Sequence, residues 1–274
     1  MATRLLYQLG VLLLLAIAAA WTSGAAAFGL PRVSSGYCVW TSPFNTVNAT
    51  AIHIGNTKSC ISGYGGRLDP YTMYQFCIPS WVAFTANSTL FGEAAMNHAG
   101  VSPGTAVSGF KRLLGVRVFA GILMGELKKT AEAWLGREIM YAVVTVPADF
   151  NDAQRSHVTA AAELRGGFHA AKAVDEEVAA AAAYRLHEKR GDGKAILVFH
   201  LGGRTCHATK FRFHNGTARL LVERHDAYLG GDDFTCRIVD YFVKLIKEKH
   251  HRDISEDEGA LRKLRADSEV LKKS

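Results

Sequence analysis

The 274-residue sequence lacks several patterns that would define a function class at once. It contains no G-x-S-x-G elbow and no cysteine–histidine pattern resembling a nucleophile with its base, so a hydrolase of either type has little support. It contains no zinc-finger spacing and no aromatic-rich motif for single-stranded nucleic acid. Beyond the N-terminal region, no apolar run is long enough to cross a bilayer.

The composition is that of an ordinary globular protein. Hydrophobic residues make up 49% and charged residues 21% of the chain, which is enough apolar material for a buried core. The net charge is +7, and the basic residues gather in 244–252 and 262–273, where acidic residues are interspersed. This mixture favours solvated helix faces over a nucleic-acid surface, and we expect no nucleic-acid partner.

The cysteines form no CxxC pair, and their odd number cannot be fully paired within the chain. Their spacing does not resemble a disulfide framework. We therefore expect most of them to be buried small side chains. The five are Cys38, Cys60, Cys77, Cys206 and Cys236.

The N-terminus has the layout of a secretory signal peptide. Arg4 precedes the apolar run Val11–Trp21, and small residues follow at Gly24–Ala27. This pattern predicts a signal peptide over residues 1–27 and, after its cleavage, no membrane association. Residues 28–48, rich in Gly, Ser and Pro, are interpreted as a leader. Three glycosylation sequons agree with secretory entry, at Asn48, Asn87 and Asn215.

Hydrophobic periodicity predicts alternating strands and helices in the rest of the chain. Glycine turns at 55 and 202–203 each follow a strand-like run and precede another, which suggests two related lobes of an α/β protein with a nucleotide cleft between them. The last helix is expected to begin at a capping box, Ser255-x-x-Glu258. Expected strands are 49–64 (broken by the first turn), 78–85, 141–147, 195–201, 207–213 and 218–222. Expected helices are 121–136, 152–164, 176–190 and 232–250, and 105–115 is a helix or turn that presents Lys111.

Several segments resemble the 70-kilodalton heat-shock chaperones, and most closely the members of that family that reside in the endoplasmic reticulum. The segments are IPSWVAFT (78–85), VVTVPADFNDAQR (143–155), ILVFHLGGRT (196–205), LGGDDF (229–234) and YFVKLIKEKHHRDIS (241–255). The resemblance implies an actin-like ATPase domain with a ribonuclease H-like fold. In this family ATP binds in the cleft between two lobes, and its hydrolysis controls a separate peptide-binding domain.

The resemblance also implies a domain organisation. The first lobe of the ATPase domain corresponds to residues 49–190 and is shortened near residue 118, and a partial second lobe corresponds to 191–274. We expect no peptide-binding domain in this chain. The residues Leu271–Ser274 are not an endoplasmic-reticulum retention signal, so location in the lumen of that compartment and secretion are both open.

The site residues are carried over from the family motif by motif. Lys111 and Glu176 match its catalytic lysine and glutamate, and Pro147 and Arg155 match its interdomain relay. Arg204 stands where the family has a third glycine, and Asp149 replaces a tyrosine. Residues implied to bind ATP are Gly55, Asn56, Thr57 and Lys58 of the first loop, Gly202, Gly203, Arg204 and Thr205 of the second loop, and Glu269, Lys272 and Lys273 of the adenosine pocket.

The family's acidic positions around its metal ions all read as histidine here: His53, His200 and His207. Phosphoryl transfer depends on Mg²⁺, which prefers oxygen ligands, so the resemblance predicts lost or weakened ATP hydrolysis. Two interpretations remain open. The histidines mark a site free of functional constraint, and no metal ligand is then assigned, or they converge with Cys206 on zinc.

The resulting hypotheses belong to different classes. One is an ATP-binding chaperone homologue of the endoplasmic reticulum, with ATP or ADP and Mg²⁺ as the ligands of its family. Another is a non-enzymatic module that binds co-chaperones or nucleotide-exchange factors. The third is a degenerate product that does not fold stably, since a partial domain exposes core surface.

Overall fold

The fold is known from a computed structural model, which describes residues 49–65, 72–109, 117–184, 186, 195–214 and 217–272. The signal peptide, the leader, Lys111 and Lys273 lie outside the described residues, as do the sequon asparagines Asn48 and Asn215. Among the helices in the described ranges, none has the length and apolar character that a membrane span requires.

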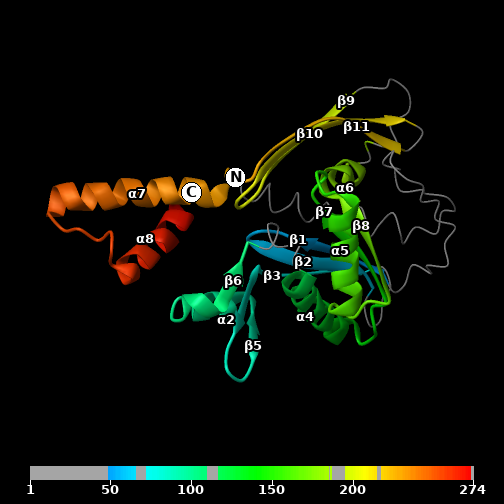
Figure 1. Ribbon diagram of the computed structural model, residues 1–274, viewed down its shortest axis with the longest axis horizontal. Coiled ribbons are helices and arrows are strands. Elements are labelled where there is room, and N and C mark those ends of the chain that lie inside the picture. The colour runs from blue at the N-terminus through cyan, green and yellow to red at the C-terminus, as the bar shows by residue number, and fades with distance from the viewer. Residues whose placement is uncertain are drawn as a thin grey trace.

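A five-stranded mixed sheet forms the centre of the first lobe, in the order β3-β2-β1-β7-β8 (Figure 1). The first three strands pair antiparallel, whereas β1, β7 and β8 run parallel to one another. The bounds are β1 Ala49–Ile54, β2 Lys58–Tyr64, β3 Met73–Pro79, β7 Tyr141–Val146 and β8 Ala170–Asp175. The parallel strands need helical crossovers, which α4 (Arg117–Leu135) and α5 (Asp152–Leu164) supply.

The two faces of this sheet bury different residues, because side chains alternate along a strand. Ile52 and Val144 point into the main core, which α4 and α5 cover with residues such as Leu127. Their neighbours Ala51 and Val143 point to the opposite face and pack against α6 (Glu176–Ala183).

The expected strand 78–85 is two strands in the structure. β3 ends at Pro79 and β4 (Trp81–Phe84) begins after Ser80, whose buried hydroxyl lies 2.8 Å from that of Ser59. β4 belongs to a small side sheet of order β5-β4-β6, with β5 Thr89–Phe91 and β6 Ala106–Ser108. Helix α2 (Gly92–Ala99) and the short 3₁₀ helix η2 (Pro103–Thr105) complete this unit.

From Ala195 onward the chain forms the second sheet, which is three-stranded and antiparallel, in the order β11-β10-β9. Its inner face packs on α6 through Phe211 and Ala218, which meet Val178. The strands are β9 Ala195–Leu201, β10 Cys206–His214 and β11 Thr217–Asp226, and β10 pairs antiparallel with both of the others.

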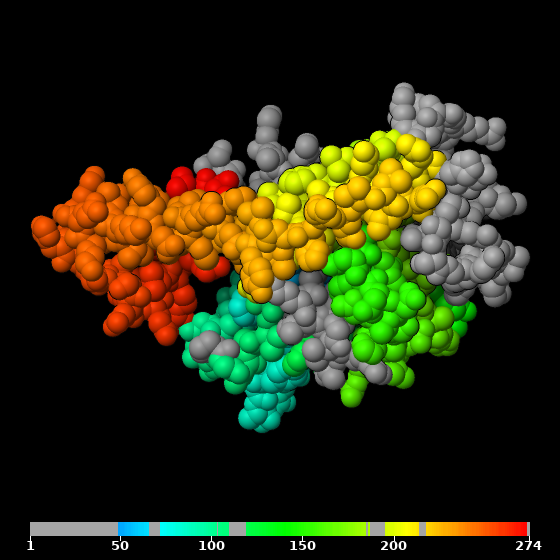
Figure 2. Space-filling model, turned by 45° about the horizontal axis from the view of Figure 1, so that its top comes forward, coloured from blue at the N-terminus to red at the C-terminus, as the bar shows by residue number. Residues whose placement is uncertain are grey.

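Two helices end the described chain. Helix α7 (Gly231–His250) projects from the end of the second sheet, and α8 (Glu258–Leu271) folds back beside it (Figures 1 and 2). The capping prediction for α8 is wrong by two residues: Asp257 accepts the N–H of Ala260 at 2.9 Å, while the Ser255 hydroxyl donates to Asp253. A guanidinium N–H of Arg262 on α8 donates to the Gly100 carbonyl after α2.

The expectation about the cysteines is wrong for one pair. Cys60 on β2 lies opposite Cys77 on β3, with the Cα atoms 4.1 Å apart, and the two sulfur atoms form a disulfide. Directly opposed residues of an antiparallel pair can come this close, and linear spacing does not reveal the register. Cys206 is a buried thiol and Cys236 an exposed one.

Candidate functional site

The two glycine turns have the same local geometry and lie against each other. In the first, the N–H of Gly55 donates to the Lys58 carbonyl at 3.1 Å, and in the second, the N–H of Gly202 donates to the Thr205 carbonyl at 2.8 Å. A Cβ added to Gly203 would lie 2.2 Å from the Thr57 methyl group. The turns that sequence reasoning assigned to two separate lobes are therefore in direct contact, and a side chain at residue 203 would displace Thr57.

Two of the three histidines at the family's acidic positions, His53 and His200, lie beside one buried carboxylate. Glu176, at the start of α6, is 2% exposed and has its Oε1 atom 3.8 Å from Nδ1 of His53 and its Oε2 atom 3.8 Å from Nδ1 of His200. Nδ1 of His53 also lies 2.9 Å from the hydroxyl of Thr145 on β7. Glu176, His53 and His200 thus lie together, whereas Lys111, the other residue predicted as catalytic, lies outside the described residues.

His207 extends this cluster into a row across the second sheet. The register pairs His207 on β10 with His200 on β9 and with His225 on β11. Ring centroids are 6.2 Å apart for the first pair and 5.8 Å for the second, which is stacked. Cys206 precedes His207 on the strand, so alternation places its thiol on the other face, and burial raises the pKa of that thiol.

A second group of charges adjoins the row, where the loop after β7 meets β11. Asp149 in this loop lies 3.6 Å from Nδ1 of His225, and Glu223 lies two residues before His225 on the same strand. Burial, followed by the charge of Asp149, raises the pKa of Glu223. Sequence reasoning noted Asp149 as a departure but missed Glu223 and His225, because only the strand register brings them to the site.

The two residues predicted as the interdomain relay, Pro147 and Arg155, make hydrogen bonds within the loop after β7. Arg155 donates from Nε to the Phe150 carbonyl at 2.8 Å and from Nη2 to the Ala148 carbonyl at 3.1 Å. Its Nη1 atom lies 2.5 Å from the buried carboxylate of Asp175. Burial raises the pKa of Asp175, and Arg155 opposes this effect without cancelling it. Pro147 opens the same loop, and its carbonyl accepts the N–H of Phe150 at 3.2 Å.

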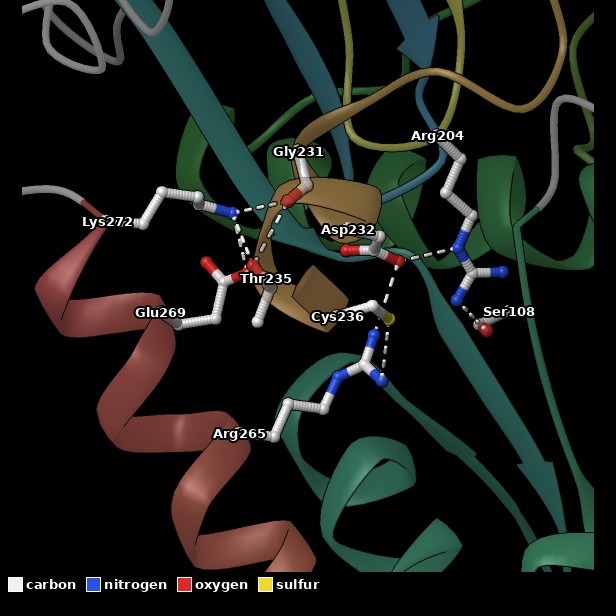
Figure 3. A network of polar contacts seen from close by, with 9 residues as sticks. All are labelled: Ser108, Arg204, Gly231, Asp232, Thr235, Cys236, Arg265, Glu269 and Lys272. Atoms are coloured by element: carbon white, nitrogen blue, oxygen red, sulfur yellow. Dashed lines mark hydrogen bonds and ion pairs between the residues drawn. The ribbon is translucent and has the colours of Figure 1, made fainter. Parts of the chain in front are cut away.

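Arg204 in the second turn uses its guanidinium to connect distant elements (Figure 3). Its Nε atom donates to Asp232 Oδ2 at 2.8 Å, and its Nη2 atom donates to the hydroxyl of Ser108 on β6 at 3.3 Å. The side chain also lies against Gly109, where an added Cβ would sit 2.5 Å from Nη1. The Arg204 side chain therefore joins β6 to the start of α7.

The predicted adenosine-pocket residues form a polar network between α7 and α8 (Figure 3). Lys272 Nζ donates to the Gly231 carbonyl and to the Thr235 hydroxyl, both at 2.8 Å, and lies 2.7 Å from Glu269 Oε1. The Thr235 hydroxyl donates to the same carboxylate. Gly202 and Gly203 accept the N–H groups of Gly231 and Asp232, so the second turn is also tied to α7.

The remaining predicted nucleotide-binding residues sit in or beside the turns. Asn56 and Thr205 are buried, whereas Thr57 and Lys58 are exposed. A mixed sheet and a second sheet that bring two such turns together over a common cluster define a partial two-lobed, actin-like ATPase domain of the α/β class.

The comparisons with known proteins agree with this class. The family model described as "Hsp70 protein" matches residues 117–274. A curated relative, "Heat shock 70 kDa protein BIP3" from Oryza sativa subsp. japonica, is 36% identical over a 268-residue alignment that covers 81% of this chain. The chain belongs to the Hsp70 family, whose members are ATP-binding chaperones. It spans 40% of the length of that relative.

Proposed function

We propose that this chain is an Hsp70-type nucleotide-binding module of the secretory pathway that does not catalyse magnesium-dependent ATP hydrolysis. The observation that supports the proposal is the grouping of His53 and His200 around Glu176, with His207 next to His200. Mg²⁺ takes oxygen ligands and binds imidazole poorly, so this donor set does not fit the magnesium ion of the family. Without that ion, the charge that develops on a transferring phosphoryl group is not neutralised.

The proposed division of the chain keeps a first lobe over residues 49–190, shortened near residue 118, and a partial second lobe over 191–274. Lys111 is proposed as the counterpart of the family's catalytic lysine. ATP or ADP would be held by the two glycine turns and by the Glu269 and Lys272 network, with Lys273 next to it.

A location in the lumen of the endoplasmic reticulum, or secretion from it, is part of the proposal. The Cys60–Cys77 disulfide supports it, because disulfides persist in oxidising compartments and are rare in the cytosol. The relative is named as a BIP protein, which points to the same compartment.

The test is ATP turnover by the purified full chain, with nucleotide binding measured separately by calorimetry. We expect no magnesium-dependent phosphate release above that of a Glu176→Gln control. A His53→Asp, His200→Asp, His207→Asp variant restores the carboxylates and is expected to gain magnesium affinity. Turnover by the unaltered chain that needs Mg²⁺ and disappears in Glu176→Gln would contradict the proposal.

A second candidate function is binding of co-chaperones or nucleotide-exchange factors without catalysis, since Hsp70 ATPase domains bind such partners. The projecting α7 and α8 pair favours it, because most side chains on α7 are at least partly accessible (Figure 2). Co-purification with a purified exchange factor, compared in the presence and absence of ADP, tests this candidate. The third hypothesis, a product that does not fold stably, predicts no cooperative thermal transition by circular dichroism.

A further inference from the structure

Three side chains from separate segments converge beside the histidine row. They are Asp149 in the loop after β7, His207 on β10 and Glu223 on β11, and one ligand atom of each lies within 4.8 Å of the other two. His207 is 4% exposed, Glu223 is partly buried and Asp149 is exposed, so the group runs from the interior to the surface. Of the three, only His207 stands at one of the acidic positions that the family uses around its metal ions.

The strand register explains this convergence. His207 pairs with His225 on β11, and residues two apart on a strand share a face, so Glu223 lies diagonally opposite His207 on the same face of the sheet. The loop after β7 approaches that face and carries Asp149, whose carboxylate is 3.6 Å from Nδ1 of His225. The Arg155 hydrogen bonds to Ala148 and Phe150 hold both neighbours of Asp149 in position.

We propose that Asp149, His207 and Glu223 form a zinc-binding site. One imidazole and two carboxylates are a donor set that Zn²⁺ accepts, whereas the imidazole disfavours Mg²⁺. Ligand atoms around a tetrahedral zinc lie about 3.3 Å apart, so side-chain rotations close the spacing seen here. Three protein ligands leave a fourth position for water.

The surrounding charges favour a cation at this position. Asp149 and Glu223 repel each other, and Asp175 adds a third carboxylate nearby. The groups that act on Glu223 in the opposite direction are His225 and Arg155, and Arg155 is paired with Asp175. His225 acts as a positioning residue, because it orients Asp149 rather than completing the ligand set. This set differs from the earlier zinc interpretation, since Cys206 faces away and His53 and His200 contact Glu176 instead.

The experiment uses the full chain, stripped with a chelator and titrated with Co²⁺ as a visible-absorption probe and then with Zn²⁺ in competition. We expect one equivalent of metal to bind. Glu223→Gln and Asp149→Asn are each expected to weaken zinc affinity by more than about 100-fold, since even an outer partner is worth roughly 10- to 100-fold. His225→Asn is expected to weaken zinc affinity by roughly 10- to 100-fold, the effect of an outer partner.

Two matched variants make the result decisive. Glu256→Gln removes an exposed carboxylate outside the group and is expected to leave affinity unchanged, and circular dichroism checks that each variant keeps its fold. His200→Asn separates this site from the Glu176 cluster. The proposal is overturned if the unaltered chain binds no zinc, if Glu223→Gln and Asp149→Asn keep its affinity, or if His200→Asn alone abolishes binding.

Discussion

Arg204 in the second turn departs from the family pattern and also connects two other elements. Arg204 stands where the family has a glycine, and its side chain reaches both Asp232 on α7 and Ser108 on β6. The guanidinium is partly buried, and a hydrogen bond between charged partners is stronger than a neutral one. Its contribution is therefore to hold together elements that are 96 and 28 residues away in sequence.

Replacing Arg204 with alanine is expected to lower the free energy of unfolding by about 1–2 kcal/mol, because one charged hydrogen bond and one weaker contact are lost. The matched variant Arg204→Lys keeps the charge but cannot bond in both directions, and we expect it to recover less than half of the loss. Urea unfolding gives the energies, and hydrogen exchange at the start of α7 reports the local effect. Equal stability of all three proteins would contradict the assignment.

The site could be predicted in part from single residues. The resemblance brought His53, His200, His207 and Glu176 to one place, and the structure gathers them there. The resemblance could not identify Glu223 as a site residue, because the neighbours of Glu223 depend on which residues of β10 and β11 pair. Side-chain pairing across a hairpin is a property of the register and not of the linear sequence.

Whole elements were predicted well where local signals are strong. Helix α5 spans the expected 152–164, because Asn151 and Gln154 form a reciprocal capping box before the apolar stripe. Strand β9 also has its expected bounds. Strand β8 was missed, since the run AAKAVD has no clear period of two, and its pairing with β7 decides its conformation. The last helix was predicted, but with the wrong capping residue.

The link between β2 and β3 has a stability consequence. The Cys60–Cys77 disulfide closes a loop with a sequence separation of 17 residues, for which the chain-entropy estimate is about 3 kcal/mol. A Cys60→Ala, Cys77→Ala variant is expected to have a free energy of unfolding lower by that amount, measured by urea unfolding. Cys236→Ala, which alters an exposed thiol, is the matched control and should unfold like the parent. A double variant as stable as the control would show that the bond contributes nothing.

The residue that ends α7 has a backbone conformation that lowers the stability of the chain. His251 follows the helix with φ 53° and ψ 27°, a left-handed conformation that glycine adopts without a steric penalty. His251→Gly is expected to stabilise the chain by roughly 0.5–1 kcal/mol. The neighbouring His250→Gly, at the last residue of the helix, is expected to destabilise the chain, because glycine is a poor helix former. Thermal melts and exchange rates of the last turn distinguish the two, and the same sign for both would refute the argument.

At the scale of the whole molecule, the second sheet is covered unequally on its two faces. The inner face packs on α6, whereas Leu197 is 67% exposed, Phe199 64% and Val222 48% on the outer face. Leu197 on β9 and Val222 on β11 flank Lys210 on β10 in the register, so the outer patch consists of apolar side chains on the two flanking strands with a lysine between them. Exposed apolar surface of this kind on a sheet favours association with other apolar surfaces.

The outer patch leads to a prediction about the behaviour of the chain in solution. We expect the full chain to bind the dye ANS at neutral pH, and a Leu197→Thr, Phe199→Thr variant to bind much less, because threonine keeps strand propensity while removing the apolar surface. Its free energy of unfolding should change by less than about 0.5 kcal/mol, since both side chains lie at the surface.

Phe211→Ser is the opposite control, because that ring is 1% exposed. It should unfold the chain more easily, by roughly 3–5 kcal/mol, and increase dye binding. Undiminished dye binding in the double threonine variant would place the accessible apolar surface elsewhere in the molecule.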